Sequence, residues 1–584
     1  MALFRKLNSQ LVIRSSYRPF PRTITPLRAR KPFTESARSL AGHSREQLSE
    51  LFEYTSGRWL WNDAQKRSER RRVFNVSELK RIAAAAVNRN VQDVVRFEKL
   101  AEGGFNRTFL VTMHDGYQFV GRIPYLVTEP KHLVVASEVA TMDFLRSHGL
   151  PVPKVYSYST TSENPAGTEY IFMERIRGTK LGDIWFDLPE KARITVVTKL
   201  VELESRLFAL PFPASGSIYY NKDLKVECNK VDIPVVDSGC ASGFCVGPDT
   251  RLRLWYGKRL DIQTDRGPYM DSAAVLTAGA KKEIAYLKEF GRPLHPFQRL
   301  HREIYNYEKQ SPFEHMDSLE KYLQIVPYLT PNGNETLTRP TLRHPDLNPG
   351  NIFISDDLEI TGLIDWQNSA ILPLFLQCGI PNSLQNYGDS VSESLTLPEI
   401  PHDFNELSER KQSEQVELLR RRQIHYFYVA MTAKLNPTHY DALNYEFSTL
   451  RRKLFDHSGS YWEGDNVTLK ADLVNLTKKW SNIVNSCSRN ATKPPCPIFF
   501  SEDEVSECLR LDAAQVEADE QLKACEDAVG IGSEGWVPAE LYDEIKQRER
   551  KLKADALEAA ESEEERQRLH EHWIFDDFDE EEYL

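Results

Sequence analysis

The chain has 584 residues, of which 41% are hydrophobic and 27% charged, and its formal net charge is −11. These proportions are typical of a globular protein, and no stretch approaches the roughly 18 consecutive apolar residues that a membrane-spanning helix needs. The acidic balance argues against nucleic acid as a partner, because non-specific binding to it needs a basic surface. The 8 cysteines form no C-x-x-C pair, which favours free thiols in a reducing compartment.

The N-terminus is basic, unlike the chain as a whole. Residues 1–34 contain eight Lys or Arg residues, and the first acidic residue is Glu35. Apolar residues are scattered, so the segment lacks the continuous core of a secretory signal. An amphipathic, Arg-rich and acid-poor start is typical of a mitochondrial presequence, which we assign to residues 1–45. The alternative is a basic tail that binds an acidic partner. We therefore expect the protein in the mitochondrion, in the matrix.

A β-rich region is predicted after a polar N-terminal extension over residues 46–93. Near the end of the extension, Asn75 is expected to cap a helix, with Glu78 in the capping-box position. Asp115-Gly116 is typical of a hairpin between two apolar strands. The expected elements are strands at 95–100, 108–113, 117–123 and 170–173 and a helix at 131–148. Residues 94–173 are thus predicted to form a β-rich lobe.

The rest of the chain is predicted to be mostly helical. Residues 174–500 form a second lobe, in which residues 211–340 alternate loops and helices. The expected elements are helices at 179–210, 277–292, 298–325, 406–436, 437–456 and 467–485 and a hairpin within 341–366. Residues 501–584 are acidic and helix-prone, which favours a solvated helix with a disordered end. The alternative is that Trp573 and nearby aromatic residues dock on the body or on a protein partner.

One stretch, residues 342–354 (LRHPDLNPGNIFI), carries the chemistry. It contains the pattern H-x-D-x-x-x-x-N, formed by His344, Asp346 and Asn351, and Asp365 follows fourteen residues after Asn351. Phosphoryl transfer needs positioning and cations rather than covalent chemistry from the protein. Asp346 can orient a substrate hydroxyl and accept its proton. Asn351 and Asp365 offer the hard oxygen ligands that Mg²⁺ prefers.

A predicted hairpin brings the two metal-ligand candidates together. Residues 352–354 and 360–364 are apolar, and Ser355-Asp356-Asp357 forms a turn between them. A hairpin of this length returns the chain to its starting point, so Asp365 is expected beside Asn351. An isolated H-x-D or Asn-Pro loop is an ordinary turn. The hairpin and the correct spacing together make the pattern a motif.

These residues resemble the catalytic and metal-binding loops of the aminoglycoside-phosphotransferase and choline-kinase-like branch of the kinase fold. More narrowly, five segments resemble the fungal altered inheritance of mitochondria protein 9 family: residues 54–59 (YTSGRW), 74–76 (FNV), 267–269 (GPY), 365–367 (DWQ) and 373–377 (PLFLQ). The resemblance spans roughly residues 50–500. It implies an α+β, two-lobed protein-kinase-like fold, with a β-rich N-lobe, a mostly helical C-lobe and an acidic helical C-terminal tail. It supplies no activity for the narrower family.

The resemblance also implies a nucleotide site in the first lobe. Gly103, Gly104 and Asn106 stand where a glycine turn covers the phosphates of ATP with backbone N–H groups. The next strand carries Arg122 where the family has a lysine, and arginine is larger, planar and bidentate, so the change is not neutral. Glu138, on the following helix, would pair with it. Taken one at a time, without the resemblance, the two glycines would be ordinary turn residues, and Arg122 and Glu138 would be ordinary surface charges.

Residues 170–176 (YIFMERI) resemble the hinge between the lobes. Adenine would bond backbone groups near Glu174 and Ile176, so the side chains there carry little information. In loops of this type the histidine, here His344, braces the loop by packing and hydrogen bonding. We expect it to be structural rather than a catalytic base.

The leading hypothesis is an ATP- and Mg²⁺-dependent kinase that acts on the hydroxyl of an unidentified small molecule. No phosphosite loop is evident after Asp365, which favours a small-molecule acceptor over a regulated protein kinase. The alternative is a non-catalytic or nucleotide-binding pseudokinase that serves as a scaffold for mitochondrial organisation or inheritance. Arg122 and the thin glycine turn favour the scaffold, whereas the intact Asp346, Asn351 and Asp365 oppose it. A third possibility is transfer of AMP.

Overall fold

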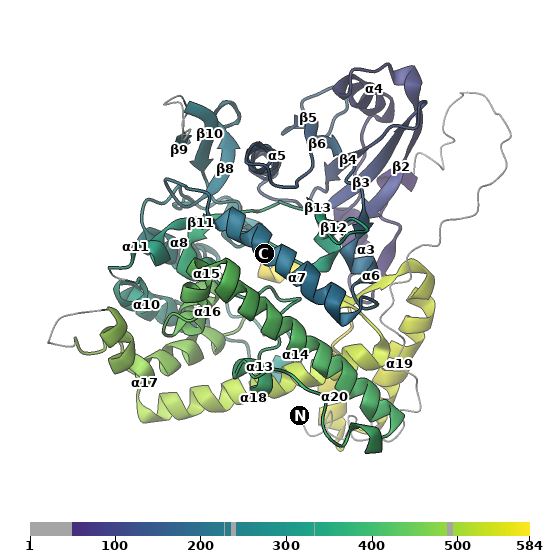
Figure 1. The fold of residues 1–584 in the computed structure, drawn as a ribbon. Helices are drawn as coiled ribbons and strands as arrows, with labels where there is room; N and C mark the ends of the chain where they lie inside the picture. The colour runs from purple at the N-terminus through teal and green to yellow at the C-terminus, as the bar shows by residue number, and fades with distance from the viewer. Residues whose placement is uncertain (1–49, 227, 235–240, 332, 488–493) are drawn as a thin grey trace.

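The computed structural model describes residues 50–226, 228–234, 241–331, 333–487 and 494–584. The predicted presequence lies outside the described residues. A β-sheet lobe (purple to blue in Figure 1) stands above a larger helical lobe (teal to green), as the kinase-like prediction requires. The α+β, two-lobed fold is confirmed.

The N-lobe is built on a five-stranded antiparallel sheet in the order β2-β3-β4-β6-β5. Its strands are β2 (Val94–Glu102), β3 (Asn106–Met113), β4 (Gln118–Pro124), β5 (Val155–Ser159) and β6 (Tyr170–Glu174). Four of them match predicted strands, and Gly116, with φ 83°, closes the predicted hairpin between β3 and β4. The fifth, β5, was not predicted, because it is short and its residues are only half-buried. Aromatic residues such as Phe109 and Phe172 fill the core beneath the sheet.

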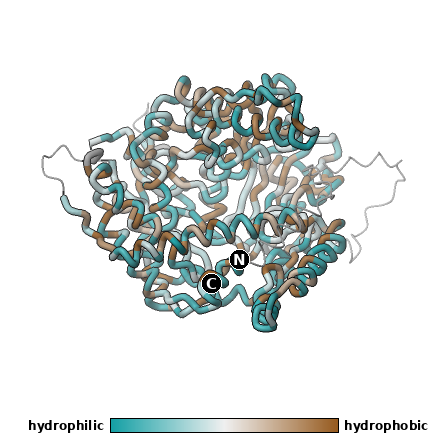
Figure 2. Tube along the Cα trace, turned by 90° about the horizontal axis from the view of Figure 1, so that it is seen from below, coloured by the Kyte–Doolittle hydropathy of each residue, from teal (hydrophilic) through white to brown (hydrophobic). Residues whose placement is uncertain are grey.

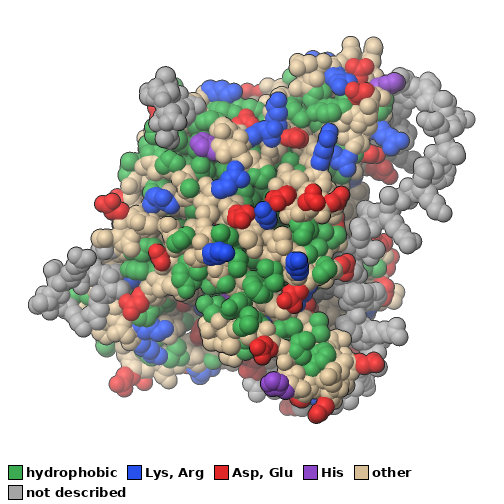
Figure 3. Space-filling model, viewed as in Figure 1, with side chains coloured by type: hydrophobic (Ala, Val, Ile, Leu, Met, Phe, Trp, Pro, Cys, Tyr) green, Lys and Arg blue, Asp and Glu red, His purple; other side chains and the backbone are tan. Residues whose placement is uncertain are grey.

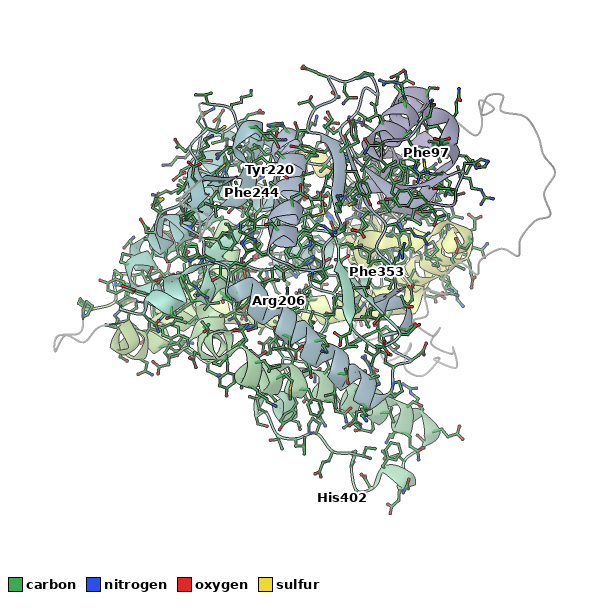
Figure 4. The ribbon with its side chains drawn as sticks, turned by 45° about the horizontal axis from the view of Figure 1, so that its top comes forward. Phe97, Arg206, Tyr220, Phe244, Phe353 and His402 are labelled. Carbon is green, nitrogen blue, oxygen red and sulfur yellow. The ribbon has the colours of Figure 1, made fainter. Side chains whose placement is uncertain are left out.

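Helix α5 (Lys131–Ser147) packs between this sheet and a smaller one that the sequence analysis missed. The smaller sheet consists of β8 (Ser217–Tyr220), β9 (Val231–Pro234) and β10 (Ala241–Gly247). The Tyr220 hydroxyl donates to the Asp143 carboxylate of α5. In Figure 4, Tyr220 lies beside Phe244 of β10, and their rings stack with centroids 4.9 Å apart. The small sheet therefore holds α5 from the side opposite the N-lobe.

The C-lobe is built from helices around one large apolar core. Its long helices α7 (Glu190–Phe208) and α14 (Glu409–Leu435) lie side by side in Figure 1. Figure 2, seen from below, shows hydrophilic and hydrophobic residues interspersed along the tube. The other elements are α8 (Ser272–Phe290), α11 (Glu335–Thr338), β11 (Pro340–Leu342), β12 (Ile352–Ile354), β13 (Ile360–Leu363), β14 (Ile371–Pro373), α12 (Leu374–Gln377), α13 (Ser390–Glu393) and α17 (Thr468–Cys487).

Three predicted helices are interrupted. The one expected at 179–210 divides into β7 (Thr179–Lys180), α6 (Leu181–Ile184) and α7, which begins directly after Pro189. The one expected at 298–325 divides into α9 (Arg299–Ile304) and α10 (Pro312–Leu329), where Asn306 and Tyr307 adopt left-handed backbone. The one expected at 437–456 divides into α15 (Pro437–Leu443) and α16 (Ser448–Gly459), at Phe447 with φ 58°.

The two ends of the described chain meet. Strand β1 (Gly57–Trp59) pairs antiparallel with β15 (Trp536–Pro538). The tail contributes α18 (Glu502–Val529), α19 (Tyr542–Glu558) and α20 (Glu563–Glu571), and the extension contributes α3 (Asp63–Glu69) and α4 (Val76–Ala86). In Figure 1 the tail helices (yellow) lie beneath the N-lobe and along the C-lobe. We call residues 50–72 together with residues 501–584 the belt.

The predicted solvated helix with a disordered end is wrong for the tail. Trp573 and Phe575 are 0% and 1% exposed, and they pack in a separate apolar cluster with α9, α18 and α19. The acidic tail thus has an apolar face, which the body covers, while its carboxylates line the outer face. No described helix is both long enough and apolar enough to span a membrane.

Candidate active site

The catalytic loop between β11 and β12 is anchored from below by a buried ion pair. Arg343 Nε donates to Glu204 Oε1 of α7 (2.8 Å), and the Tyr428 hydroxyl of α14 donates to Glu204 Oε2 (2.6 Å). An arginine paired in this way fixes the main chain of the residue that follows it. The long C-lobe helices thereby set the position of the loop.

His344 stabilises the loop by hydrogen bonding and packing, which is the structural role expected for the histidine of this loop type. Its Nε2 bonds the Ile364 carbonyl (2.8 Å), and its Nδ1 accepts from the main-chain N–H of Asp346 (3.1 Å). Its ring packs edge-on against Trp366. Burial lowers the pKa of His344, so the imidazole is held neutral with its proton on Nε2. It is fully engaged in the scaffold and does not serve as a base.

Asp346 presents its carboxylate to solvent at the tip of the loop. Its Oδ2 accepts from Asn348 Nδ2 (2.7 Å) and from Asn351 Nδ2 (3.3 Å). Asn351 Nδ2 also donates to the Asp346 carbonyl (2.9 Å). Two amides therefore orient the carboxylate, and one oxygen, Oδ1, stays available for an acceptor hydroxyl.

The predicted hairpin is confirmed and brings the metal-ligand candidates together. Ile352 pairs with Leu363, and the Ile364 N–H donates to the Asn351 carbonyl (3.0 Å), immediately before Asp365. Asp365 has left-handed backbone, with φ 68°. Such a conformation is uncommon outside glycine and gathers at functional sites. The two donor groups, an amide oxygen and a half-exposed carboxylate, fit Mg²⁺.

Arg122 joins the two lobes. Its Nη1 donates to Glu138 Oε1 of α5 (2.6 Å), and its Nη2 donates to Asp365 Oδ1 (2.7 Å). The same Nη2 also donates to Gln367 Oε1 (2.9 Å). The structure thus places a cation of the N-lobe directly on the carboxylate that we assign to the metal.

Burial and charge act against each other in this cluster. Burial raises the pKa of Glu138 to about 7, although Arg122 opposes the shift. For Asp365, burial also raises the pKa, but the charge of Arg122 and its hydrogen bond outweigh this, so the pKa lies below its usual value. Asp365 is accordingly ionised at neutral pH and ready to bind a cation.

The glycine turn lies over the same cluster. The Gly103 N–H donates to the Asn106 carbonyl (2.9 Å), which closes the turn between β2 and β3. A Cβ on Gly104 would meet no protein atom within 4 Å. The packing of the protein therefore does not require a glycine at this position.

The turn is anchored to the belt by the residue that precedes it. Glu102 Oε2 accepts from the main-chain N–H groups of Thr55 and Ser56, each at 2.8 Å. Its other oxygen accepts from Arg107 Nε (2.9 Å). The belt therefore holds the base of the glycine turn.

The hinge residues lie at the start of the connection between the lobes. The Glu174 N–H donates to the Lys154 carbonyl (2.8 Å), so that donor is not available to a base. The Ile176 side chain packs over Gly362, where a Cβ would lie 2.4 Å from Ile176 Cγ2. Ile176 is thus fixed against β13.

Comparison with known proteins agrees with this geometry. The phosphotransferase enzyme family matches residues 96–375, which include the glycine turn, Arg122 and the catalytic loop. A subtelomeric hrmA-associated cluster protein of Aspergillus fumigatus is 32% identical over 497 residues, covering 80% of this chain and 93% of that protein. The chain belongs to the phosphotransferase enzyme family.

Two further proteins are similar to this family member. The mitochondrial protein altered inheritance of mitochondria protein 9 of Saccharomyces cerevisiae is 25% identical over 567 residues, covering 85% of this chain and 87% of that protein. A putative fructosamine-3-kinase of Thermobifida fusca, known as a crystal structure, is 13% identical with a TM-score of 0.31, covering 75% of this chain and all of that one (100%).

The structure also adds a residue to which the sequence analysis gave no role. Gln367 is buried, and its Oε1 accepts from Arg122 and from Asn106 Nδ2 of the glycine turn. If the Asn106 amide is turned over, its oxygen accepts from Arg122 Nη2 (2.7 Å) and Nε (3.1 Å) instead. Either orientation links the turn to the cation. The only sequence signal for Gln367 is its place two residues after Asp365.

Proposed function

We propose that this protein transfers the γ-phosphoryl group of Mg-ATP to a hydroxyl group of a small molecule. The observation that carries the proposal is the assembly of Asp346, Asn351, Asp365 and Arg122 by contacts that join the two lobes. Arg122 would grip the phosphates under the glycine turn, steadied by Glu138. Asn351 and Asp365 would hold Mg²⁺, which neutralises phosphate charge when it is bound.

The chain's own residues account for the transfer step. Asp346 Oδ1 accepts the proton of the acceptor hydroxyl as the hydroxyl oxygen bonds to the γ-phosphorus. The bond from the γ-phosphorus to the β,γ-bridging oxygen breaks, and ADP leaves with that oxygen. Arg122 stabilises the charge that develops on the phosphates, because its fork can donate two parallel hydrogen bonds.

A cavity beside the catalytic loop supports a small acceptor. It encloses about 510 Å³ and is lined by Phe186, residues 382–385, Glu417, Arg420, Arg421 and Ile424. The Ser383 hydroxyl, which lines the cavity, donates to the carbonyl of Leu347 (3.2 Å), the residue after Asp346 in the chain. A volume of this size suits a metabolite. Basic and acidic side chains are interspersed on the face shown in Figure 3, which agrees with a partner other than nucleic acid.

We place this activity in the mitochondrion, and in its matrix. The support is the basic, acid-poor N-terminus together with the relatives whose names call them mitochondrial.

A scaffold without catalysis is the competing function. It is favoured by the direct Arg122–Asp365 contact, since this pairing satisfies both groups without a ligand. It is also favoured by the belt, which ties the lobes together independently of nucleotide. Phosphoryl transfer separates the two functions, because a scaffold, with or without bound nucleotide, forms no phosphorylated product.

The test uses the full chain and ATP labelled on the γ-phosphate, with Mg²⁺ and a mitochondrial small-metabolite extract. Label in a low-mass product with the native chain, and not with Asp346→Asn, establishes the kinase. A parallel reaction uses ATP labelled on the α-phosphate: Mg-ATP binding without transfer of γ-label, but with α-label in a product of this second reaction, establishes AMP transfer. Absence of both Mg-ATP binding and transfer refutes the kinase and supports the scaffold.

A further inference from the structure

Gln367 occupies a rigid position between the two halves of the phosphate site. The preceding residue, Trp366, is 1% exposed, its indole N–H donates to the Leu363 carbonyl (3.0 Å), and its ring packs on His344. The Ser369 N–H donates back to the Trp366 carbonyl (3.3 Å), which closes a turn around Gln367. The side chain is therefore held by the same scaffold that holds the catalytic loop.

The Gln367 amide oxygen is shared by two elements of the N-lobe. Arg122 of β4 and Asn106 at the start of β3 both lie within hydrogen-bonding distance of it. The amide nitrogen, Nε2, is buried and has no hydrogen-bond partner among the described residues. An unpaired buried donor is costly. A phosphate oxygen that entered beside Arg122 would supply the acceptor that this nitrogen lacks.

An arginine at position 122 must be held in a particular orientation, which a lysine would not require. Lysine is a point charge, whereas the arginine fork must be turned correctly to bind phosphate. Glu138 fixes only Nη1, and Nη2 divides between Asp365 and Gln367. When a metal ion takes Asp365, the amide oxygen of Gln367 still accepts from Nη2.

We propose that Gln367 is the positioning residue of the phosphate site, which keeps Arg122 and the glycine turn in place when Asp365 is engaged by the metal. The proposal rests on the proposed function and adds a residue to it. A neutral oxygen suits this role because it orients the guanidinium and still lets a phosphate compete for it. A carboxylate at the same place would hold Arg122 too strongly and would repel the phosphates.

The experiment measures binding of two probes, Mg-ATP and adenosine, to the full chain by titration calorimetry. Adenosine lacks phosphates, so it reports the base site alone. Gln367→Met keeps the length and removes both polar atoms, and Gln367→Glu keeps an acceptor and adds a charge. A hydrogen bond to a charged group corresponds to roughly a tenfold to hundredfold change in affinity. We expect both variants to weaken Mg-ATP by this factor and to leave adenosine within about twofold.

Gln412→Met is the matched control, because Gln412 bonds two main-chain carbonyls near the start of α14, away from the cleft. Unchanged Mg-ATP affinity in both Gln367 variants overturns the proposal. An equal loss of Mg-ATP and adenosine also overturns it, since this shows a structural role. If the native chain binds no Mg-ATP, the proposed function itself fails. Thermal unfolding of each variant shows whether it is folded. If one of the two Gln367 variants does not fold, the affinities of the other variant test the proposal.

Discussion

Replacing Trp573 with alanine tests whether the tail belongs to the folded body. The Trp573 side chain is 0% exposed, and its indole N–H donates to Glu549 Oε1 (2.7 Å). Burial of about 150–250 Å² of aromatic surface at about 25 cal/mol per Å² gives roughly 4–6 kcal/mol. Measured Trp-to-Ala losses of about 3–5 kcal/mol agree. Glu549 keeps its ion pair with Lys546 (3.0 Å), so its lost hydrogen bond adds little.

We therefore expect Trp573→Ala to lower the free energy of unfolding of the tail by about 4–5 kcal/mol. This is a large share of the about 5–15 kcal/mol that stabilises a typical domain. Hydrogen exchange across residues 502–584, followed with limited proteolysis, measures the loss. Faster exchange should appear in α18 to α20 and in β1, because β15 is the partner of β1.

Phe499→Ala is the matched control, since Phe499 is 80% exposed at the entry to the tail. Its effect should stay within about 0.5 kcal/mol. A Trp573→Ala protein whose tail exchanges as slowly as in the native chain would contradict the reasoning, because a buried indole cannot be removed without cost. Such a result would show that Trp573 does not hold the tail on the body.

Three further predictions follow from the same structure. Asp365→Asn should abolish the Mg²⁺ dependence of ATP binding, because it removes the charged oxygen ligand; calorimetry with and without Mg²⁺ measures this, and an unchanged dependence would exclude Asp365 as a ligand. Tyr220→Phe removes the hydrogen bond to Asp143 and should destabilise the chain by about 1–3 kcal/mol, measured by urea unfolding; an unchanged midpoint would show that the small sheet does not hold α5. Burial lowers the pKa of His315 to about 4. An unfolded histidine has a pKa of about 6.5, so the unfolded state binds a proton at a higher pH than the folded state does. The free energy of unfolding is therefore highest above pH 6.5 and declines by about 3 kcal/mol in total as the pH falls to about 4. His315→Leu should flatten the unfolding profile over that range, and the exposed His402, at the lower edge of Figure 4, should change nothing when replaced by leucine.

Short-range sequence patterns were sufficient to predict the geometry of the candidate site. The hairpin over β12 and β13 lies within a short stretch of chain, so apolar alternation and a turn fix its geometry, and Asp365 returns to Asn351 as the spacing predicts. The N-lobe strands are similarly local, since β2, β3 and β4 are consecutive antiparallel neighbours. Arg122 was assigned to the phosphate site from its position on the strand that follows the glycine turn. Its contact with Glu138 follows from the order of that strand and the next helix.

Elements joined over long distances along the chain were decided only by the tertiary structure. Helix propensity continues through 298–325, but packing of Asn306 and Tyr307 in left-handed backbone ends α9 there. The small sheet that holds α5 was not evident from periodicity, because its strands are only a few residues long.

The sequence by itself determined which residues form the candidate site: a carboxylate, an amide and a second carboxylate at fixed spacing, with an arginine where the resemblance leads us to expect a lysine. The tertiary structure decided what surrounds that chemistry. Gln367 gains a role because folding brings it to Arg122, 245 residues away in the chain, and the tail is ordered because β15 finds β1 across more than 470 residues. The physical reason is the same in both cases. Hydrogen bonds and apolar contacts depend on distance in space, and only the complete fold sets that distance.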